Sequence, residues 1–334
     1  MGSNSDLTVS ELLARYWKYT NGYYRKDGKP TNEISALKSA LRPVKELYGK
    51  TLVREFGPLS LKAVRGRMIA DGWSRTGINR AISRVRRIFR WGVAKELLPS
   101  AIFESLRCVD GLRKDRTKAR ETAPILPVQD SLIDATLPYL PQIVGNMVRL
   151  HRLTGMRPAE LCMMRPCDLD RSSDVWIYRP QSHKIEHRGR ERIIPLGPKA
   201  QGILLRYLVR DGQTYCFRPC DSEAKRRAAR HQSRKTPLSC GNRPGKKRKR
   251  NPKRPAGEAY TIDSYRRAIH RACDKGNLEK WNPIRLRHTA ATEIRCEFGL
   301  EAAQVILGHS QADVTQVYAE RDMAKGLEVA RQIG

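Results

Sequence analysis

The sequence lacks an apolar run long enough to cross a membrane. A spanning helix needs about 18 or more consecutive apolar residues, and no such stretch is found in the chain. No apolar segment typical of a signal peptide follows Met1. The start Met1-Gly2 resembles a myristoylation signal, but Asp6 stands where that signal needs serine or threonine. We therefore expect a soluble protein that stays inside the cell and does not bind membranes.

Acidic residues are few relative to basic ones. Asp and Glu number 34 against 65 Lys and Arg, which gives a net charge of +31 and a pI near 10.3. Such an excess favours a polyanionic partner, with nucleic acid as the first choice and an anionic membrane as the second. The chain has 334 residues and is 40% hydrophobic, enough for about two domains that each fold around a core.

The sequence also lacks a cysteine pattern typical of a zinc finger or of a disulfide-rich protein. The eight cysteines are scattered in a chain large enough to fold without disulfides, so we expect reduced thiols. Cys216, Cys220, His231 and Cys240 supply groups that bind zinc, but their spacing fits no common zinc finger. The sequence therefore predicts neither a metal nor any other cofactor.

Apolar residues at helical spacing predict an N-terminal helical domain over residues 7–112. The expected helices run from Thr8 to about Tyr23, from Glu33 to Tyr48, from Leu61 to an end at Gly72, and from Arg75 to Lys95. Asn32 and Ser60 are the expected caps of the second and third helices.

The helix expected from Arg75 to Lys95 has a basic face opposite its apolar stripe. Arg80, Arg84 and Arg87 lie on this face. A solvated surface is the alternative explanation for such a face. In so basic a chain, we expect the three arginines to contact the phosphates of DNA.

A charged segment separates this domain from a second one. Residues 113–124 have no apolar periodicity and predict a linker. The second domain is expected over residues 125–334. Its expected elements are helices at 128–137, 142–154 and 261–273 and strands at 175–179 and 191–194.

Residues 218–258 form a basic insertion within the second domain. They are rich in proline and glycine and poor in apolar residues, a composition that predicts disorder in the absence of a partner. The densest basic run is Lys246, Lys247, Arg248, Lys249 and Arg250. A nuclear-localisation signal is one interpretation of this run, but contact with the DNA backbone is the simpler one.

The stretch from Pro283 to Tyr318 contains residue types suited to phosphoryl transfer onto a tyrosine. Arg287 lies at the start of an expected helix and can bind a phosphate through two parallel hydrogen bonds. His309 ends a Leu-Gly-His sequence and can donate to the same phosphate. Tyr318 follows nine residues later and is a candidate nucleophile.

A second arginine lies in the sequence LTGMRPAELC. Arg157 is expected at a helix start, because Pro158 suits the first helical turn. Glu160 follows three residues later and shares a face with Arg157. An ordinary surface ion pair is the alternative interpretation.

These segments together resemble a known family. LRHTAATEI followed by LGHSQADVTQVYAE resembles the C-terminal signature of tyrosine recombinases, the phage integrase family, and LTGMRPAELC resembles that family's first arginine box. The resemblance implies a mostly α fold: a SAM-like helical core-binding domain, and an α-rich catalytic domain with a small β-hairpin or sheet. It also implies that the two domains clamp a DNA duplex, and that no arm-binding domain precedes them.

The resemblance further implies the reaction and the residues that carry it out. The enzyme would cut and rejoin double-stranded DNA through a 3′-phosphotyrosine, as a homotetramer on paired sites and a monomer or dimer otherwise. The implied catalytic set is Tyr318 as nucleophile, Arg157 and Arg287 as phosphate ligands, His309 as a phosphate donor and Lys184 as general acid. Glu160 would orient Arg157. A plain phosphate contact is the alternative role for Lys184, which lies in the expected hairpin.

One position departs from the family pattern. The family usually has histidine three residues before its second arginine, and this chain has Ile284 there. Isoleucine neither accepts nor donates a proton. Either another group supplies the base, with His288 and a bound water as the candidates, or cleavage is slow, or the protein is degenerate.

Two other functions remain open from the sequence alone. One is a type IB topoisomerase-like strand transferase, and the other is a decayed integrase that only binds DNA. The preferred expectation is a mobile-element recombinase that acts in DNA integration, located in the cytoplasm with the nucleoid.

Overall fold

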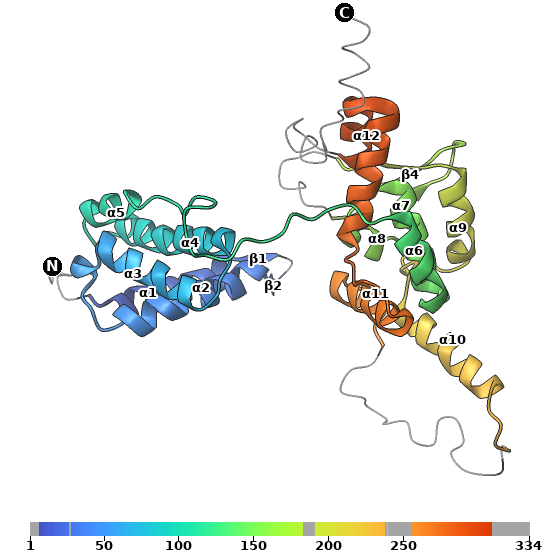
Figure 1. Cartoon of the computed structure of the whole chain (residues 1–334), viewed down its shortest axis with the longest axis horizontal. Coiled ribbons are helices and arrows are strands. Elements are labelled where there is room, and N and C mark those ends of the chain that lie inside the picture. Colours follow the sequence, from blue (N-terminus) through green and yellow to red (C-terminus); the bar gives the residue numbers. More distant parts are fainter. Residues whose placement is uncertain (1–6, 27, 183–190, 238, 240–255, 309–334) are drawn as a thin grey trace, which may run out of the picture. The chain divides into compact units, whose positions relative to one another are not determined.

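We describe a computed structural model of the chain that covers residues 7–26, 28–182, 191–237, 239 and 256–308. The chain divides into two compact units, Met1–Pro124 and Ile125–Gly334 (Figure 1). Helices dominate both units, and the strands are short and antiparallel. The expected mostly α fold with a small sheet is therefore confirmed. Among the described residues, no helix combines the length and apolarity needed to span a bilayer.

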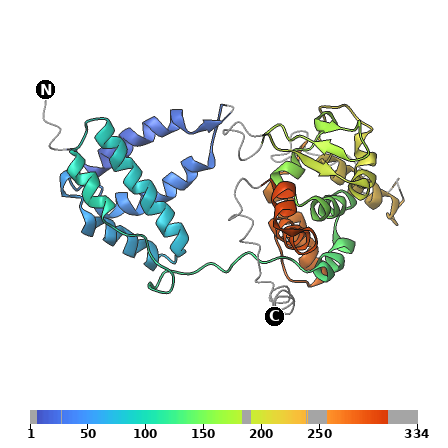
Figure 2. The same ribbon diagram turned by 90° about the horizontal axis from the view of Figure 1, so that it is seen from above.

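Five helices build the described part of the first unit. They are α1 (Val9–Tyr23), α2 (Asn32–Tyr48), α3 (Pro58–Ala70), α4 (Arg75–Ala94) and α5 (Ser100–Arg107) (Figure 2). The strands β1 (Arg25–Lys26) and β2 (Lys29–Pro30) form a two-stranded ribbon between α1 and α2, and a short 3-10 turn, Val53–Glu55, precedes α3. The four helices expected here are confirmed, and α5 was not expected.

Side-chain capping explains two of these helix starts, those of α1 and α4. The Thr8 hydroxyl accepts a hydrogen bond from the Glu11 backbone N–H, and the Glu11 carboxylate in turn accepts from the Thr8 N–H. Ser74 caps α4 in the same way, by accepting from the Gly77 N–H. The caps expected at Asn32 and Ser60 are wrong, because Thr31 precedes α2 and a Gly57-Pro58 start already suits α3.

The core of the first unit forms where apolar stripes meet. On α4, Ile78, Val85, Ile88 and Phe89 have no exposed surface. The Phe89 ring stacks on Phe56 with ring centroids 4.9 Å apart. The amphipathic pattern of the sequence thus determines which face of α4 is buried.

Part of the expected linker is attached to the first unit. The Arg75 backbone N–H donates to the Arg120 carbonyl at 2.9 Å, and the Arg75 side chain pairs with Glu121. Ala119 is 6% exposed and belongs to the core of this unit. The segment 113–124 is therefore held by α4 as far as Glu121.

The second unit is built around α7. Its elements are α6 (Asp130–Thr136), a 3-10 turn (Leu137–Tyr139), α7 (Gln142–Thr154), α8 (Pro158–Cys162), a 3-10 turn (Pro166–Asp168), β3 (Leu169–Asp170), β4 (Trp176–Tyr178), β5 (Ile194–Leu196), α9 (Pro198–Leu208), α10 (Pro219–Gln232), α11 (Ile262–Gly276) and α12 (Ile284–Leu307). Val144, Met147, Val148 and Leu150 on α7 have no exposed surface. Helix α7 packs against α9, α11 and α12, so it forms the centre of this unit.

The sheet has the strand order β3-β4-β5, and both pairs are antiparallel. Trp176 pairs with Leu196 and Tyr178 pairs with Ile194. The strand expected at 175–179 is confirmed, while the one expected at 191–194 begins three residues later than predicted, at Ile194. Residues 183–190, which connect β4 to β5, lie outside the described residues.

Two segments differ from the sequence-based expectation. The disorder expected over residues 218–258 is wrong for Pro219–Gln232, which forms helix α10. Alanine, arginine and lysine favour helix, and together they make up much of this stretch. Every residue of α10 is described and none is buried, so it projects from the unit in Figure 1. Helix α9 was not predicted.

Candidate active site

The first candidate arginine is fixed to a buried carboxylate at the start of α8. Gly155 ends α7 in the left-handed conformation, with φ of 57°, and the chain then turns into Arg157 and Pro158. The Arg157 backbone N–H donates to Glu160 Oε2 at 2.7 Å, and its Nη1 donates to Oε1 at 2.8 Å. Glu160 is 1% exposed, whereas the Arg157 side chain is 21% exposed. Arg157 is thus anchored by its partner and still reaches solvent.

A second arginine shares the same carboxylate. Arg192 Nε lies 3.5 Å from Glu160 Oε1, and both side chains are 2% exposed. Burial alone would raise the pKa of Glu160, but Arg192 and the hydrogen bonds from Arg157 outweigh it and hold that pKa below its ordinary value. Glu160 is therefore a carboxylate that joins two cations.

Arg287 binds the ends of two helices. It lies on the first turn of α12 and is 2% exposed. Its Nη1 donates to the Gly155 carbonyl and its Nη2 to the Leu307 carbonyl, both at 2.7 Å. These carbonyls lie at the C-terminal ends of α7 and α12, where the helix dipole favours a positive charge. Arg287 thus connects the arginine box near Arg157 with the end of α12.

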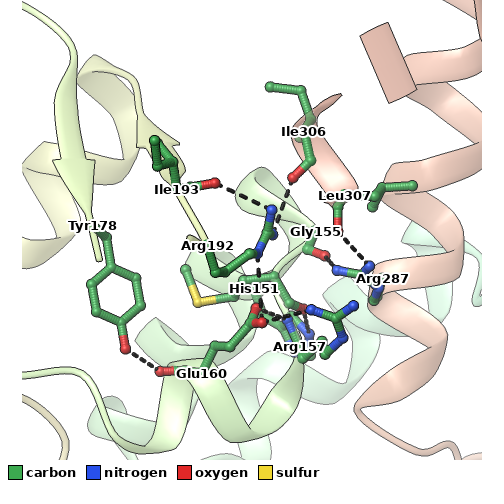
Figure 3. A network of polar contacts seen from close by, with 11 residues as sticks. His151, Gly155, Arg157, Glu160, Tyr178, Arg192, Ile193, Arg287, Ile306 and Leu307 are labelled. Atoms are coloured by element: carbon green, nitrogen blue, oxygen red, sulfur yellow. Dashed lines mark hydrogen bonds and ion pairs between the residues drawn. The ribbon is translucent and has the colours of Figure 1, made fainter. Parts of the chain in front are cut away.

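Two further buried side chains complete this network, shown in Figure 3. His151 on α7 has no exposed surface, and its Nε2 lies 2.8 Å from the Met156 carbonyl. Burial, with a smaller contribution from Arg287, lowers the pKa of His151 to about 4, so the ring is neutral at neutral pH. The Tyr178 hydroxyl donates to the Glu160 carbonyl at 2.7 Å and ties β4 to α8.

Of the residues that the motifs singled out, the structure brings Arg157, Glu160 and Arg287 into one polar network. His288 follows on α12 and is half-buried. Its pKa is lowered, by burial first and by Arg287 second. Ile284 is the first residue of α12 and is half-buried. The expected catalytic residues Lys184, His309 and Tyr318 lie outside the described residues.

Sequence reasoning did not predict the roles of Arg192 and His151. The only local signal for Arg192 is its place directly before the apolar stretch that forms β5. Its carbonyl acceptor is Ile306, 114 residues away in sequence. His151 lies within an apolar helix with no motif around it. The sequence around Arg192 and His151 does not indicate which groups these side chains contact.

The basic face of α4 is partly paired within the first unit, which was not expected. Arg84 binds Glu33 of α2 through two hydrogen bonds of 2.9 and 2.8 Å, and Arg87 pairs with the same carboxylate. Both arginines are half-buried, whereas Arg80 is exposed. Two of the three expected phosphate ligands therefore already have a carboxylate partner within the first unit. The basic run 246–250 lies outside the described residues.

Comparison with known proteins fits this geometry. A sequence model of the phage integrase family matches residues 141–325, which is more than half of the chain. Tyrosine recombinase XerC of Thermodesulfovibrio yellowstonii is 26% identical over 294 residues, covering 84% of this chain and 83% of that protein. Tyrosine recombinase XerC of Corynebacterium efficiens is 26% identical over 284 residues, covering 83% of this chain and 78% of that protein.

Solved structures share the fold at low sequence identity. A lambda integrase dimer bound to a COC′ core site superposes with a TM-score of 0.68 at 14% identity, covering 96% of this chain and 79% of that one. The Tn1549 transposon integrase in complex with transposon right end DNA superposes with a TM-score of 0.64 at 18% identity, covering 98% of this chain and all of that one.

The fold and the motif network define an enzyme that cleaves and rejoins DNA strands. The chain belongs to the phage integrase family, the tyrosine recombinases. It is a site-specific DNA recombinase, and nothing in the comparisons favours a topoisomerase or a protein that only binds DNA.

Proposed function

We propose that this recombinase cuts double-stranded DNA with Tyr318 as the nucleophile and Arg157 and Arg287 as ligands of the scissile phosphate. The observation that supports the proposal is the polar network in which buried Glu160 holds Arg157 and the carbonyls of two helix ends hold Arg287. A preorganised cation stabilises the charge of a phosphoryl-transfer transition state without reorganising during the reaction.

In the proposed reaction the Tyr318 oxygen attacks the phosphorus, and the bond to the 5′ oxygen breaks. Lys184 would give a proton to that leaving oxygen, and His309 would donate a hydrogen bond to the phosphate. The phosphotyrosine ester keeps the energy of the broken phosphodiester. A 5′-hydroxyl can therefore attack this ester, release Tyr318 and rejoin the strand without an added energy source.

The tyrosine hydroxyl must lose its proton, and its ordinary pKa is about 10. Ile284 cannot accept that proton. We propose His288 for this role, because it is adjacent to Arg287 and its lowered pKa keeps the imidazole neutral at neutral pH. Glu160 acts indirectly, by fixing Arg157.

We further propose that the substrate is a pair of duplex sites bound by four copies of the chain. The net charge of +31 suits a polyanionic partner. Lambda integrase has been solved both as a dimer on a core site and as a tetramer on a Holliday junction. Monomers or dimers are expected on single sites, and integration of a mobile element is the proposed biological outcome.

The test of the proposed cleavage is covalent attachment to DNA. Supercoiled plasmid carrying the flanking DNA of the element would be incubated with the protein and analysed on a denaturing gel. We expect a protein–DNA adduct with the wild-type chain and none with Tyr318→Phe, which removes one oxygen and should bind DNA with similar affinity. An adduct of equal yield from Tyr318→Phe would contradict the assignment, and no adduct from either protein would favour a decayed integrase.

A further inference from the structure

Arg192 belongs to the buried network, yet the family motifs give it no task. It lies two residues before β5 and is 3% exposed as a whole residue. Its Nε faces Glu160 at 3.5 Å, its Nη1 donates to the Ile193 carbonyl at 3.2 Å, and its Nη2 donates to the Ile306 carbonyl at 3.1 Å. The side chain therefore joins the segment that leads into β5 to α8 and to the end of α12.

The end of α12 is shaped around this guanidinium. Gly308 terminates the helix in the left-handed conformation, with φ of 64°. A Cβ atom at Gly308 would lie 2.3 Å from Arg192 Nη1 and 3.0 Å from its Cζ. Glycine is needed at this position both for its backbone conformation and for the close approach of Arg192. The residue after Gly308 in the sequence is His309.

Two buried arginines bind successive carbonyls at this corner. Arg192 takes the carbonyl of Ile306, and Arg287 takes that of Leu307. A buried ion pair is weak evidence for stability, because well-packed apolar side chains often replace one at no cost. Arg192 lies between Glu160, which holds Arg157, and the Ile306 carbonyl, which lies just before the Gly308 turn. This position favours a role in fixing the distance between the two.

We propose that Arg192 is a positioning residue for DNA cleavage, which sets the Gly308 corner relative to Arg157 through Glu160. This role rests on the proposed function of Arg157, His309 and Tyr318. Arg192 needs no contact with DNA to fulfil it. Its replacement is expected to slow cleavage of bound DNA and to leave the affinity for DNA nearly unchanged.

The test compares Arg192→Lys with Arg165→Lys. Lysine at 192 keeps the charge opposite Glu160 but cannot also donate to Ile306 with a rigid fork. Arg165 is the matched control in the same unit, because its side chain donates two hydrogen bonds of 3.1 and 2.9 Å to Asp168 and one to Gln213, away from Glu160. For each protein the Tm, the Kd for a duplex site and the rate of adduct formation at saturating DNA would be measured.

We expect Arg192→Lys to slow adduct formation at saturating DNA by about 10-fold or more, because small displacements of catalytic groups are costly. Its Kd should stay within about twofold of wild type. Arg165→Lys should cleave at nearly the wild-type rate, even if its Tm falls equally. Gly308→Ala, which pushes Arg192 aside with a new Cβ, is the second variant and should show the same selective decrease in rate.

A chemical readout separates positioning from general destabilisation. A methylphosphonate at the scissile position removes the negative charge that Arg157 is proposed to stabilise. The rate deficit of Arg192→Lys should shrink on this neutral substrate, and a deficit of equal size on both substrates would contradict a route through Glu160 and Arg157. If the wild-type protein forms the adduct and Arg192→Lys forms it at the same rate, the positioning role of Arg192 is refuted but the proposed function is not. A wild-type protein that forms no Tyr318 adduct would refute the proposed function as well.

Discussion

A single buried carboxylate determines how the charged residues of the site are arranged. Glu160 accepts hydrogen bonds from the backbone and the side chain of Arg157 and faces Arg192. Removing one member of a buried charged group leaves another charge without compensation, which is costly. The positions of the two cations therefore depend on each other. This explains how Arg157 is kept in a fixed place while its guanidinium stays partly exposed for a phosphate.

Arg287 should not tolerate replacement by lysine. Its two Nη atoms donate to carbonyls of different helices at 2.7 Å, and a single ammonium cannot reproduce that fork. We expect Arg287→Lys to abolish most adduct formation and to lower the Tm. The matched control is Arg285→Lys, two positions earlier on α12, where the side chain binds the Leu126 and Pro127 carbonyls. The assignment would be wrong if Arg285→Lys reduced activity more than Arg287→Lys.

His151 should make stability depend on pH below neutrality. Burial lowers its pKa from an ordinary 6.5 to about 4. Between these values the unfolded chain binds a proton that the folded chain does not, so the free energy of unfolding rises with pH across this window. The contribution is on the order of 3 kcal/mol, fully present above pH 6.5 and lost as the pH falls towards 4.

Chemical denaturation at several pH values would measure this effect. His151→Gln can still donate to the Met156 carbonyl but does not titrate. The wild-type curve should therefore steepen relative to the variant between pH 4 and 6.5. Parallel curves over that range would show that His151 is not held neutral by burial.

The sequence predicted part of the site, and physical reasons limit the rest. Arg157, Glu160 and Arg287 belong to local motifs whose spacing places them at helix starts. Arg192 finds its acceptor only when β5 meets the end of α12, across 114 residues of sequence. Contacts between residues so far apart in the sequence depend on tertiary packing, and the residues next to Arg192 do not reveal that packing.

Periodicity predicted elements well where a helix has one apolar face. Helix α7 matches its expected bounds of 142–154, and α4 ends one residue before the expected Lys95. Periodicity did not predict which polar residues on such helices bind each other. Arg84 and Arg87 were expected to face DNA, but Glu33 on α2 binds both. Helix α10 was missed because its charged sequence has no apolar stripe.

Replacement of two arginines on α4 should affect different properties, DNA binding in one case and stability in the other. Arg80 is exposed, whereas Arg84 is held by Glu33 in a two-bond pair. Arg80→Gln should reduce the slope of log K against log salt for DNA binding by about 0.9 and leave the Tm unchanged. Arg84→Gln should instead destabilise the first unit by about 1–2 kcal/mol. A salt slope that changes only with Arg84→Gln would reverse the assignment of the face.

The insertion carries a large share of the net positive charge of the whole molecule. Residues 241–255 contain eight basic side chains: Arg243, Lys246, Lys247, Arg248, Lys249, Arg250, Lys253 and Arg254. Deleting this stretch should weaken DNA binding and lower the salt slope by about 0.9 for each phosphate that is no longer bound. A deletion variant that keeps the wild-type slope would show that the insertion does not touch DNA. Replacement by a neutral Gly-Ser segment of equal length is the control for chain length.

Covalent attachment of Tyr318 to DNA is the step on which the activity of the whole molecule depends. Trypsin cuts after Arg295 and Arg321, and the peptide between them contains Tyr318 as its one tyrosine. The direct measurement is mass spectrometry of the adduct after digestion with trypsin and nuclease. We expect this peptide to carry a nucleotide linked through its 3′-phosphate to Tyr318. A nucleotide on a peptide containing Tyr207, Tyr260 or Tyr265, with the peptide from 296 to 321 unmodified, would contradict the proposed mechanism.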